Sequence, residues 1–258
     1  MTEREPEPPV CDAPGVSPAE QPSQQPTPRK KAERTRAKIL DAALTLLQEE
    51  GYAATTMRAI AEKAGVSVGN AYYYFAGKEE LVQAFYMRTH EEHLVVAEPA
   101  IAAAKGFKKR LTALMETKLA TIEPYHAFAG VLFKSAADPA SPLNPFSEAS
   151  RPVRAEATAL FERVCEGARL KVPKDLAAEL PDLLWTWHMS IVLFWVHDRS
   201  PGRRRTRRLL TASIELISKL VTLSSLPLMA PVRRSALKLV RDLRADAEEQ
   251  RASEDGEG

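Results

Sequence analysis

The chain has 258 residues, with 36 lysines and arginines against 34 aspartates and glutamates, so its formal net charge is only +2; 45% of its residues are hydrophobic. This length and apolar content suffice for one or two packed domains, and they exclude fully disordered and collagen-like proteins. The most apolar run, 183–196, contains His188 and is shorter than the roughly 18–20 apolar residues that cross a bilayer, so it predicts a buried helix.

The two cysteines, Cys11 and Cys165, lie far apart in different kinds of segment and predict neither a disulfide framework nor a zinc site. The chain does not open on a basic start followed by an apolar core, so we expect no secretory signal. We therefore expect a cytoplasmic protein that has no membrane partner.

Residues 1–28 hold eight of the 19 prolines, five acidic residues and a single base, Arg4. Such a segment cannot bury enough apolar surface to offset the entropy of the chain, so it is predicted to be a disordered tail. The charge then changes sign, because six bases and one acid lie between Arg29 and Lys38.

Four helices are predicted after the tail. In the first, apolar residues recur at the i, i+3, i+4, i+7 and i+8 spacing of one helix face, and Gly51 supplies a stop. These residues are Ile39, Ala42, Ala43, Leu46 and Leu47. The other three helices are expected over about 56–64, over 68–75, and from 78 to about 97.

Helical spacing returns throughout the rest of the chain. Helices are expected near 106–122, 125–136, 148–168, 174–198, 203–224 and 231–250, with a proline-rich loop at 137–147. No alternating strand pattern is found, and residues 251–258 are expected to be a disordered acidic end. The sequence therefore predicts an all-α fold.

The turn between the second and third helices is typical of a helix-turn-helix unit. Ala61 is small where the two helices approach, and Gly65 permits a left-handed turn. Val66 fills the core, and Ser67 caps the next helix. In such units the third helix enters the major groove of DNA while the second crosses the backbone.

The stretch TTMRAIAEKAGVSVGNAYYYFAGKEEL, preceded by RTRAKILDAALTLLQEEGY, resembles the DNA-binding domain of the TetR family of bacterial transcriptional regulators. The resemblance covers roughly residues 33–81, and the tyrosine run before Phe75 and Lys78 is its most diagnostic part. It implies a DNA-binding domain over 29–80 and a helical effector-binding and dimerisation domain over 81–250. It also implies nucleoid association when the protein is bound to DNA, and no cofactor.

The resemblance places Val68, Gly69 and Asn70 at the start of the recognition helix, facing base edges, with Tyr72 close behind. Val68 departs from the polar residue often found there. Phosphate contacts are expected from a helix N-terminus, phenols and a lysine, namely Thr56, Tyr72, Tyr73 and Lys78. Tyr74 is expected to pack inside. Lys30, Lys31 and Arg34 either add nonspecific attraction to DNA or belong to a merely solvated helix start.

Two helices are expected to form a homodimer interface, because two recognition helices must meet the two half-sites of a palindromic operator. The helix over 203–224 carries two apolar stripes, so it needs both its own core and a partner. The stripes are Leu210, Ile214, Ile217 and Val221, and Leu209, Leu216, Leu220 and Leu223. The resemblance places the helix over 182–197 beside it, with its tryptophans in the core or the interface, or alternatively lining a pocket.

A mostly apolar or amphipathic small-molecule effector is expected to bind among large side chains of the middle helices. The candidates are Phe107, Met115, Tyr125, His126, Phe128, Phe133, Phe161, Trp187, His188 and Ile191. Each of these residues is also a candidate for ordinary core packing. A repressor released by such an effector is the leading hypothesis; the alternative is a DNA-binding protein controlled by a protein partner.

Three other readings are weaker. His90 and His93 share a helix face but lack a third ligand for zinc, so no metal site is predicted. The arginines of 203–208 form either a solvated helix start or a second nucleic-acid patch. No glycine-rich phosphate loop, GxSxG, HExxH or catalytic cysteine–histidine motif is present, so no catalytic residues and no enzyme are predicted.

Overall fold

The computed structural model describes residues 28–138, 141 and 143–256, without the side chains of 28, 128, 131, 134, 135 and 247–256. The predicted tail therefore lies outside the described residues, except for Pro28. Every regular element in the described part is a helix, which confirms the all-α prediction.

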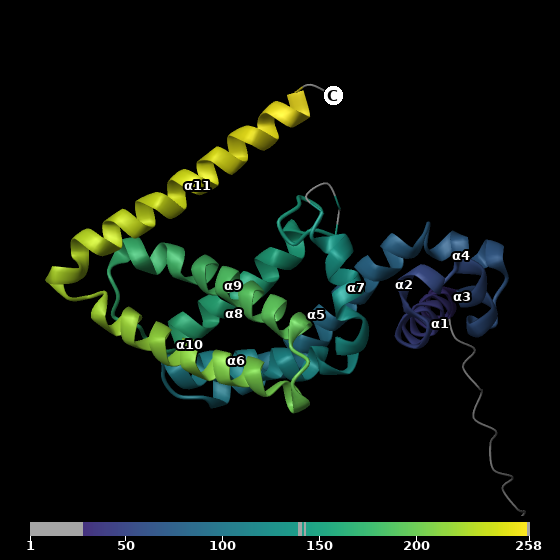
Figure 1. Ribbon diagram of the computed structural model, residues 1–258, viewed down its shortest axis with the longest axis horizontal. Helices are drawn as coiled ribbons and strands as arrows, with labels where there is room; N and C mark the ends of the chain where they lie inside the picture. The colour runs from purple at the N-terminus through teal and green to yellow at the C-terminus, as the bar shows by residue number, and fades with distance from the viewer. Residues whose placement is uncertain (1–27, 139–140, 142, 257–258) are drawn as a thin grey trace, which may run out of the picture.

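The N-terminal helices form a compact unit at one end of an elongated molecule (Figure 1). They are α1 Pro28–Glu49, α2 Gly51–Ala54, α3 Met57–Ala64 and α4 Val68–Tyr74. The predicted apolar face of α1 is buried, because Ile39, Ala42, Ala43, Leu46 and Leu47 are each at most 6% exposed.

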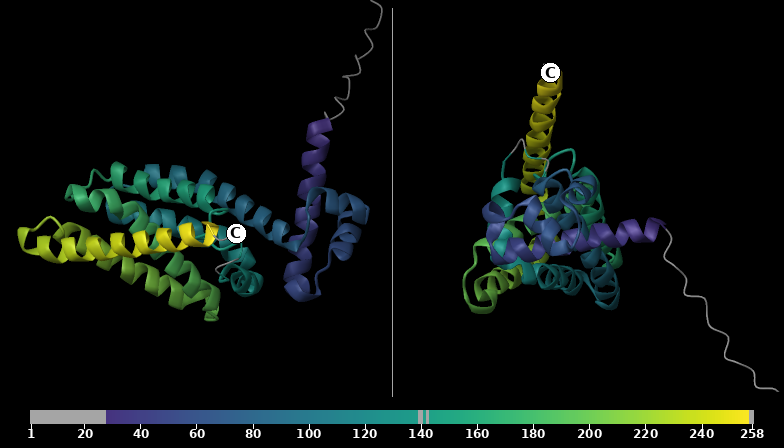
Figure 2. Two further views of the ribbon diagram at one scale, coloured as in Figure 1. Left: turned by 90° about the horizontal axis from the view of Figure 1, so that it is seen from above. Right: turned by 90° about the vertical axis from the view of Figure 1, so that its right-hand side faces the viewer.

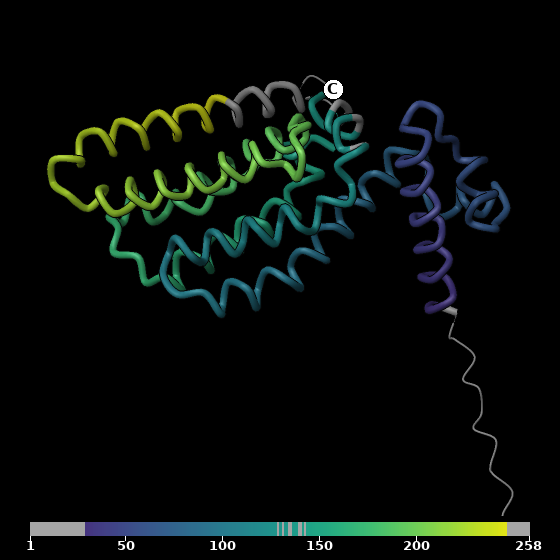
Figure 3. Tube along the Cα trace, turned by 60° about the horizontal axis from the view of Figure 1, so that its bottom comes forward, coloured from purple at the N-terminus to yellow at the C-terminus, as the bar shows by residue number. Residues whose placement is uncertain are grey.

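The remaining helices form a bundle and a C-terminal arm. They are α5 Lys78–Ala103, α6 Phe107–Ile122, α7 His126–Ala136, α8 Arg151–Gly167, α9 Lys174–His197, α10 Arg204–Leu223 and α11 Ala230–Gly256. Three short 3₁₀ turns, η1 Glu123–Tyr125, η2 Pro201–Arg203 and η3 Pro227–Met229, join them. The long helix α5 leads from the N-terminal unit into the bundle, and α11 begins at the end remote from that unit (Figures 1 and 3).

The first helix ends at Glu49, just before Gly51, as predicted; Gly51, with a φ of 82°, also begins the short helix α2, which was not predicted. Two predicted boundaries are wrong. The fourth predicted helix continues through Pro99 to Ala103 rather than ending near residue 97. The last helix passes residue 250 and reaches Gly256, because the alanine, glutamate and arginine residues there are good helix formers.

Two hydrophobic clusters hold the molecule together, and they do not coincide with the two predicted domains. The first joins the apolar faces of α1, α3, α4 and α5, and it also contains Leu132 and Ala136 of α7 and Leu143 of the following loop. The second fills the bundle of α5, α6, α8, α9 and α10. Helix α7 therefore belongs to the core of the N-terminal unit as well as to the bundle.

Helix α11 is attached to α9 mainly by charged groups. Arg233 pairs with Asp175 at 3.1 Å, and Arg241 and Arg244 each lie 2.8 Å from Glu179. Leu237 is buried, whereas Leu239 and Leu243 are exposed. The helix runs back over the bundle from its remote end (Figure 2).

Within the described residues, no single helix is long and apolar enough to span a membrane. One helix pair, Pro201–Leu223 with Pro227–Asp246, passes a test of length and composition, and it is bent by 107°.

Candidate functional site

The turn between α3 and α4 has the geometry that its residues predict. Thr56 Oγ1 accepts a hydrogen bond from Ala59 N–H at 3.1 Å, and Ser67 Oγ accepts one from Asn70 N–H at 3.1 Å, so each helix begins at a side-chain cap. Gly65 ends α3 in the left-handed region, with φ 66° and ψ 37°, where other residues are strained. The two helices are thereby fixed as a helix-turn-helix.

Helix α4 divides into a buried face and an exposed face. Ala71 and Phe75 are fully buried, and Tyr74 packs against the same cluster, as expected. Val68, Tyr72 and Tyr73 are 40%, 52% and 81% exposed. Large apolar and aromatic side chains on an outer surface indicate a contact surface rather than a core.

Gly69 and Asn70 lie beside these exposed side chains. A Cβ atom added at Gly69 would meet no other atom within 4 Å, so the packing of the protein does not require glycine there. Asn70 is partly exposed, and the hydrogen bond that caps α4 uses its backbone N–H rather than its side-chain amide. The start of α4 is therefore open to the close approach of another molecule.

Lys78 and Thr56, both predicted to contact phosphate, also have partners inside the protein. Lys78 Nζ donates to the carbonyl oxygen of Tyr52 at 2.8 Å and lies 4.3 Å from the centre of the Tyr52 ring. Tyr52 in turn donates its hydroxyl to Glu79, and burial together with this carboxylate raises the pKa of Tyr52 to about 12. Thr56 is exposed, although its hydroxyl caps α3.

The basic run forms the first turns of α1. Lys30, Lys31 and Arg34 are exposed, and within the described part of the chain their side chains make no ion pair. Arg36 instead lies over the ring of the buried Phe75, 4.7 Å from its centre. Besides Arg36, which contacts Phe75, the run contains five exposed cations near the end of the molecule that carries α4, and Lys30, Lys31 and Arg34 are three of them.

A cavity of about 310 Å³ lies inside the bundle. Its walls come from α5, α6, α7, α8, α9 and the loop that precedes α8, and they are mostly apolar. The volume is at the lower end of the roughly 300–1,000 Å³ that is typical of small-molecule sites. The wall includes Phe85, Leu132, Ala136 and Leu143, which also belong to the hydrophobic cluster of the N-terminal unit.

The structure brings only part of the predicted ligand-binding set to this space. Tyr125, Phe133 and His188 line the large cavity, whereas Met115 and Phe161 line a smaller cavity beside it. Four other candidates line neither cavity: Phe107, His126, Trp187 and Ile191. Phe128 lies among the side chains that the structure does not describe.

Polar groups that the sequence reasoning missed gather where the two cavities meet. Lys118 of α6 and His90 of α5 line both spaces together with His188 of α9. Lys118 follows the buried Met115 by three residues and the buried Leu114 by four. This spacing places Lys118 on the apolar face of α6. A lysine on an otherwise apolar helix face is the sequence feature that could have indicated Lys118.

His90 and His93, which share a helix face, have partners within the protein. His90 Nε2 donates to Glu156 at 2.9 Å, and His93 Nε2 donates to the carbonyl oxygen of Leu114 at 3.3 Å. Burial lowers the pKa of His93 to about 3 and also lowers the pKa of His90, so both are neutral near pH 7. No group of three or more potential metal ligands occurs in the described part of the chain.

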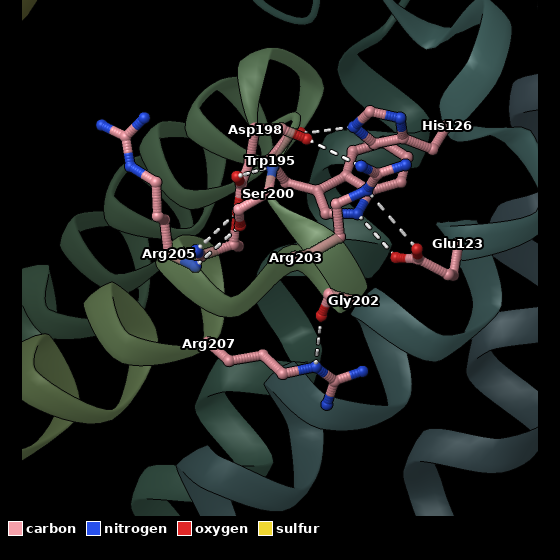
Figure 4. A network of polar contacts seen from close by, with 10 residues as sticks. Glu123, His126, Trp195, Asp198, Ser200, Gly202, Arg203, Arg205 and Arg207 are labelled. Carbon is pink, nitrogen blue, oxygen red and sulfur yellow. Dashed lines mark hydrogen bonds and ion pairs between the residues drawn. The ribbon is translucent and has the colours of Figure 1, made fainter.

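The arginine cluster begins with a residue that is tied into the interior (Figure 4). Arg203 donates to the carbonyl oxygen of Asp198 at 2.9 Å and pairs with Glu123 at 3.5 Å. Glu123 also accepts from the indole of Trp195. Its neighbour Pro124 accepts a hydrogen bond from Gln48 of α1, so this network reaches the N-terminal unit.

Helix α10 has the two faces that its sequence predicts. Leu210, Ile214 and Val221 are buried against the bundle. The second stripe is exposed: Leu209, Leu216, Leu220 and Leu223 are between 36% and 57% accessible. The three tryptophans of α9 pack in or against the bundle core.

Comparison with known proteins covers both parts of the chain. Residues 39–85 match the family described as "Bacterial regulatory proteins, tetR family", and residues 110–242 match the family described as "Tetracyclin repressor-like, C-terminal domain". The second match alone covers half of the chain.

Two curated regulators are similar to the N-terminal part. The regulator TtgR of Pseudomonas putida is 45% identical over 65 residues, which are 25% of this chain and 31% of that protein. The transcriptional repressor KstR2 of Rhodococcus jostii is 30% identical over 96 residues, 37% of this chain and 47% of that protein. The matched segments thus span less than half of each of these relatives.

Solved structures are similar over a greater length. A TetR transcriptional regulator from Nitrosomonas europaea has a TM-score of 0.55 at 22% identity, covering 72% of this chain and 99% of its own. A regulator from Syntrophomonas wolfei has a TM-score of 0.57 at 16% identity, covering 72% of this chain and 95% of its own. At these identities the likeness concerns the fold alone.

Proposed function

Because the chain belongs to the TetR family of DNA-binding transcriptional regulators, we propose that it is a dimeric repressor that a small molecule releases from a palindromic operator. Regulators of this family bind DNA, are typically dimers and are not enzymes. The observation that carries the proposal is the shared wall between the internal cavity and the core of the DNA-binding unit.

We assign recognition of the DNA base sequence to the exposed start of α4. Asn70 can form a paired hydrogen bond with adenine, and Val68 can contact a thymine methyl group. Gly69 lets the backbone approach the base edges, with Tyr72 beside it. These residues are exposed or partly exposed and come from a helix whose N-terminus is capped by Ser67, which supports the assignment.

Phosphate contacts position this helix without specifying sequence. They are assigned to Thr56, Tyr72, Tyr73 and Lys78, with Lys30, Lys31 and Arg34 adding nonspecific attraction. The ammonium group of Lys78 has three N–H donors, of which one bonds the carbonyl oxygen of Tyr52, so two remain for a phosphate oxygen.

The dimer is assigned to the helices over 182–197 and 203–224, which are the second half of α9 and all of α10. The exposed leucine stripe of α10 supports this assignment, because contiguous apolar surface on one helix face costs solvation free energy unless it is covered. A second copy of the chain would place its own α10 against this stripe in an isologous interface.

The effector is assigned to the 310 Å³ cavity, which is mostly apolar. Helix α7 supplies one wall of the cavity, and Leu132 and Ala136 of that wall pack against α1 and α5 in the N-terminal cluster. A ligand that moves α7 therefore moves the unit that carries α4. A 100-fold loss of operator affinity needs only about 2.7 kcal/mol of coupling.

The coupling is tested by filling the cavity. Ala129 of α7 lines it, whereas Ala127 of the same helix is exposed. Compounds from a panel of small apolar and amphipathic molecules are first chosen because they release DNA from the wild-type protein and raise its thermal midpoint. Both effects should disappear in Ala129→Phe and persist in the matched control Ala127→Phe.

Two outcomes would count against the proposal. Equal release of DNA from Ala129→Phe and the wild type would mean that the compounds act elsewhere. A panel without any effective compound, together with release of DNA by a protein from the same cells, would favour control by a protein partner.

A further inference from the structure

Lys118 is a cation without a partner among the residues that the structure describes. Its side chain lines the cavity from α6, and within the described part of the chain its ammonium group makes no hydrogen bond and no ion pair. Burial lowers the pKa of Lys118 to about 8 and is the one cause of this shift. The group therefore remains mostly protonated near pH 7, inside the domain and without a counter-ion.

The surroundings of Lys118 offer it no negative charge. Among the described residues that line the large cavity there are two basic side chains, Lys118 and Arg154, and neither an aspartate nor a glutamate. The nearby carboxylate of Glu156 accepts a hydrogen bond from His90, and its side chain is 58% exposed. Lys118 is partly buried, and a charge that is partly removed from water without a counter-ion is unfavourable for folding, so a partner from outside the chain would offset this cost.

Three neutral imidazoles complete this polar end of the cavity. Burial lowers the pKa values of His90, His93 and His188 below the ordinary range, so they add no positive charge near pH 7. Nδ1 of His188 is buried and makes no hydrogen bond of normal geometry. The polar end thus holds one ammonium group and one imidazole with unused hydrogen-bonding capacity.

The other walls are apolar and define a separate region for a ligand body. Ile122, Ala129, Val153 and Val192 come from four different helical segments and line the same cavity. A ligand that satisfied both regions would carry a single anionic group at one end of a compact hydrocarbon body. A metal cation does not fit, because it would lie beside the Lys118 ammonium among histidines that already have protein partners.

We propose that the effector is a compact amphiphilic carboxylic acid whose carboxylate pairs with Lys118 and hydrogen-bonds His188, while its apolar body lies against the walls of α7, α8 and α9. This inference rests on the proposed function in taking the cavity as the effector site, and it adds the chemical class of the ligand. The carboxylate supplies the missing counter-ion, and a charge-assisted hydrogen bond within the cavity is stronger than a neutral one.

The binding test uses two matched sets of probes that differ only in the head group. One set is octanoate, 1-octanol and octylamine, and the other is 3-phenylpropanoate, 3-phenylpropanol and 3-phenylpropylamine. Calorimetric titration of the full chain without DNA should show that a carboxylate binds at least about tenfold more tightly than its alcohol, and that the amine binds least.

Three variants assign that preference to one residue. Lys118→Met removes the charge and keeps an unbranched side chain that is one atom shorter, and Lys118→Gln removes the charge but keeps a polar end. Both should reduce the preference for carboxylate over alcohol to less than about threefold. The matched control Lys109→Met removes an exposed lysine of the same helix and should leave the preference unchanged.

A second readout needs no ligand. Because Lys118 is charged, partly buried and unpaired among the described residues, Lys118→Met should raise the thermal midpoint of the ligand-free protein. A lysine with a structural role would instead give a lower midpoint when it is replaced.

Several results would overturn the inference. They are equal affinity for carboxylate and alcohol in the wild type, an unchanged preference in the Lys118 variants, a lowered midpoint in Lys118→Met, and no binding by either carboxylate at about 5 mM. If an alcohol binds and releases DNA where its carboxylate does not, the carboxylate site is wrong but the ligand-responsive repressor survives. If a carboxylate binds through Lys118 without changing DNA binding, the carboxylate site is right but the ligand-responsive repressor is wrong.

Discussion

Lys78 of α5 donates to the carbonyl oxygen of Tyr52 at 2.8 Å and lies 4.3 Å above the Tyr52 ring. This contact joins the start of α5 to the chain between α1 and α3. It gives a stabilising role to a residue whose sequence context predicts only a phosphate contact.

Replacing Lys78 with alanine should therefore lower the stability of the protein even without DNA. We expect the free energy of unfolding to fall by about 1 kcal/mol, because a partly buried charged hydrogen bond and a cation–π contact are both lost. Urea unfolding measures the change, and Lys38→Ala, which removes an exposed lysine of α1, is the control. Equal stability of the two variants would contradict the structural role.

Gly69→Ala should separate folding from DNA binding. The added methyl group meets no atom within 4 Å, and alanine favours the helix over glycine, so stability should be unchanged or rise by up to about 1 kcal/mol. Operator affinity should nevertheless fall, because the methyl group lies where the backbone approaches the bases. Parallel unfolding and fluorescence-anisotropy titrations check both results, and an unchanged affinity would remove Gly69 from the interface.

Asn70→Ala and Tyr73→Phe should weaken DNA binding in different ways. Loss of the Asn70 amide should relax the preference at one base position, whereas loss of the Tyr73 hydroxyl should weaken binding to all sequences by a similar factor. Selection from randomised operators distinguishes the two patterns. If Asn70→Ala left the selected sequence unchanged, base reading would have to be assigned to other residues of α4.

The exposed stripe of α10 predicts the oligomeric state. Leu216→Glu and Leu220→Glu place a charge at positions that are 57% and 50% exposed in one chain, so the monomer should still fold while the dimer dissociates. Analytical ultracentrifugation measures the effect. Val95→Glu, at a 75% exposed position of α5, is the control and should stay dimeric. A dimer that tolerated both leucine substitutions would not use this face.

The acidity of Lys118 predicts a pH dependence of stability. Its pKa is lowered to about 8 in the folded protein, whereas an unfolded lysine has a pKa of about 10.4. Between these values the folded state binds fewer protons than the unfolded state, so the contribution of Lys118 to the free energy of unfolding rises with pH. Its destabilising effect is present in full below about pH 8 and is relieved as the pH rises above about 10.

Comparison of the wild type with Lys118→Met isolates this effect, because His90, His93 and His188 face the same space in both proteins. The stability advantage of the variant at pH 7 should shrink as the pH rises to 10. A difference that stayed constant over this range would mean that Lys118 is not destabilised by burial.

The parts of the fold that are decided by residues close together in the sequence could be predicted from it. Thr56 and Ser67 cap their helices, and Gly65 adopts the left-handed turn, because each of these features is decided within a few residues. The buried and exposed stripes of α10 were likewise readable from helical spacing. The continuation of α5 across Pro99 was not, because the local cost of proline does not reveal the packing on either side of it.

The cavity depended on contacts between distant segments and was only partly predictable. Tyr125, Phe133 and His188 were chosen as large or amphipathic side chains, and so were Phe107 and Ile191, which are buried in the bundle core instead. Size and spacing do not distinguish a cavity wall from a packed core, because both are apolar. In the sequence Lys118 is recognisable only as a lysine on the apolar face of α6, whereas its place in the wall of a cavity follows from the packing of distant segments.

The most direct test of the account is selection of fragmented genomic DNA from the source organism by the purified full-length protein. At about 150 mM salt nonspecific binding is weak, so the retained fragments report sequence-specific contacts. The account predicts that these fragments share an inverted repeat whose half-sites are about one helical turn, roughly 34–36 Å, apart. Folded protein that retained no shared sequence, or only an unpaired half-site, would contradict a dimeric repressor that reads its operator through α4.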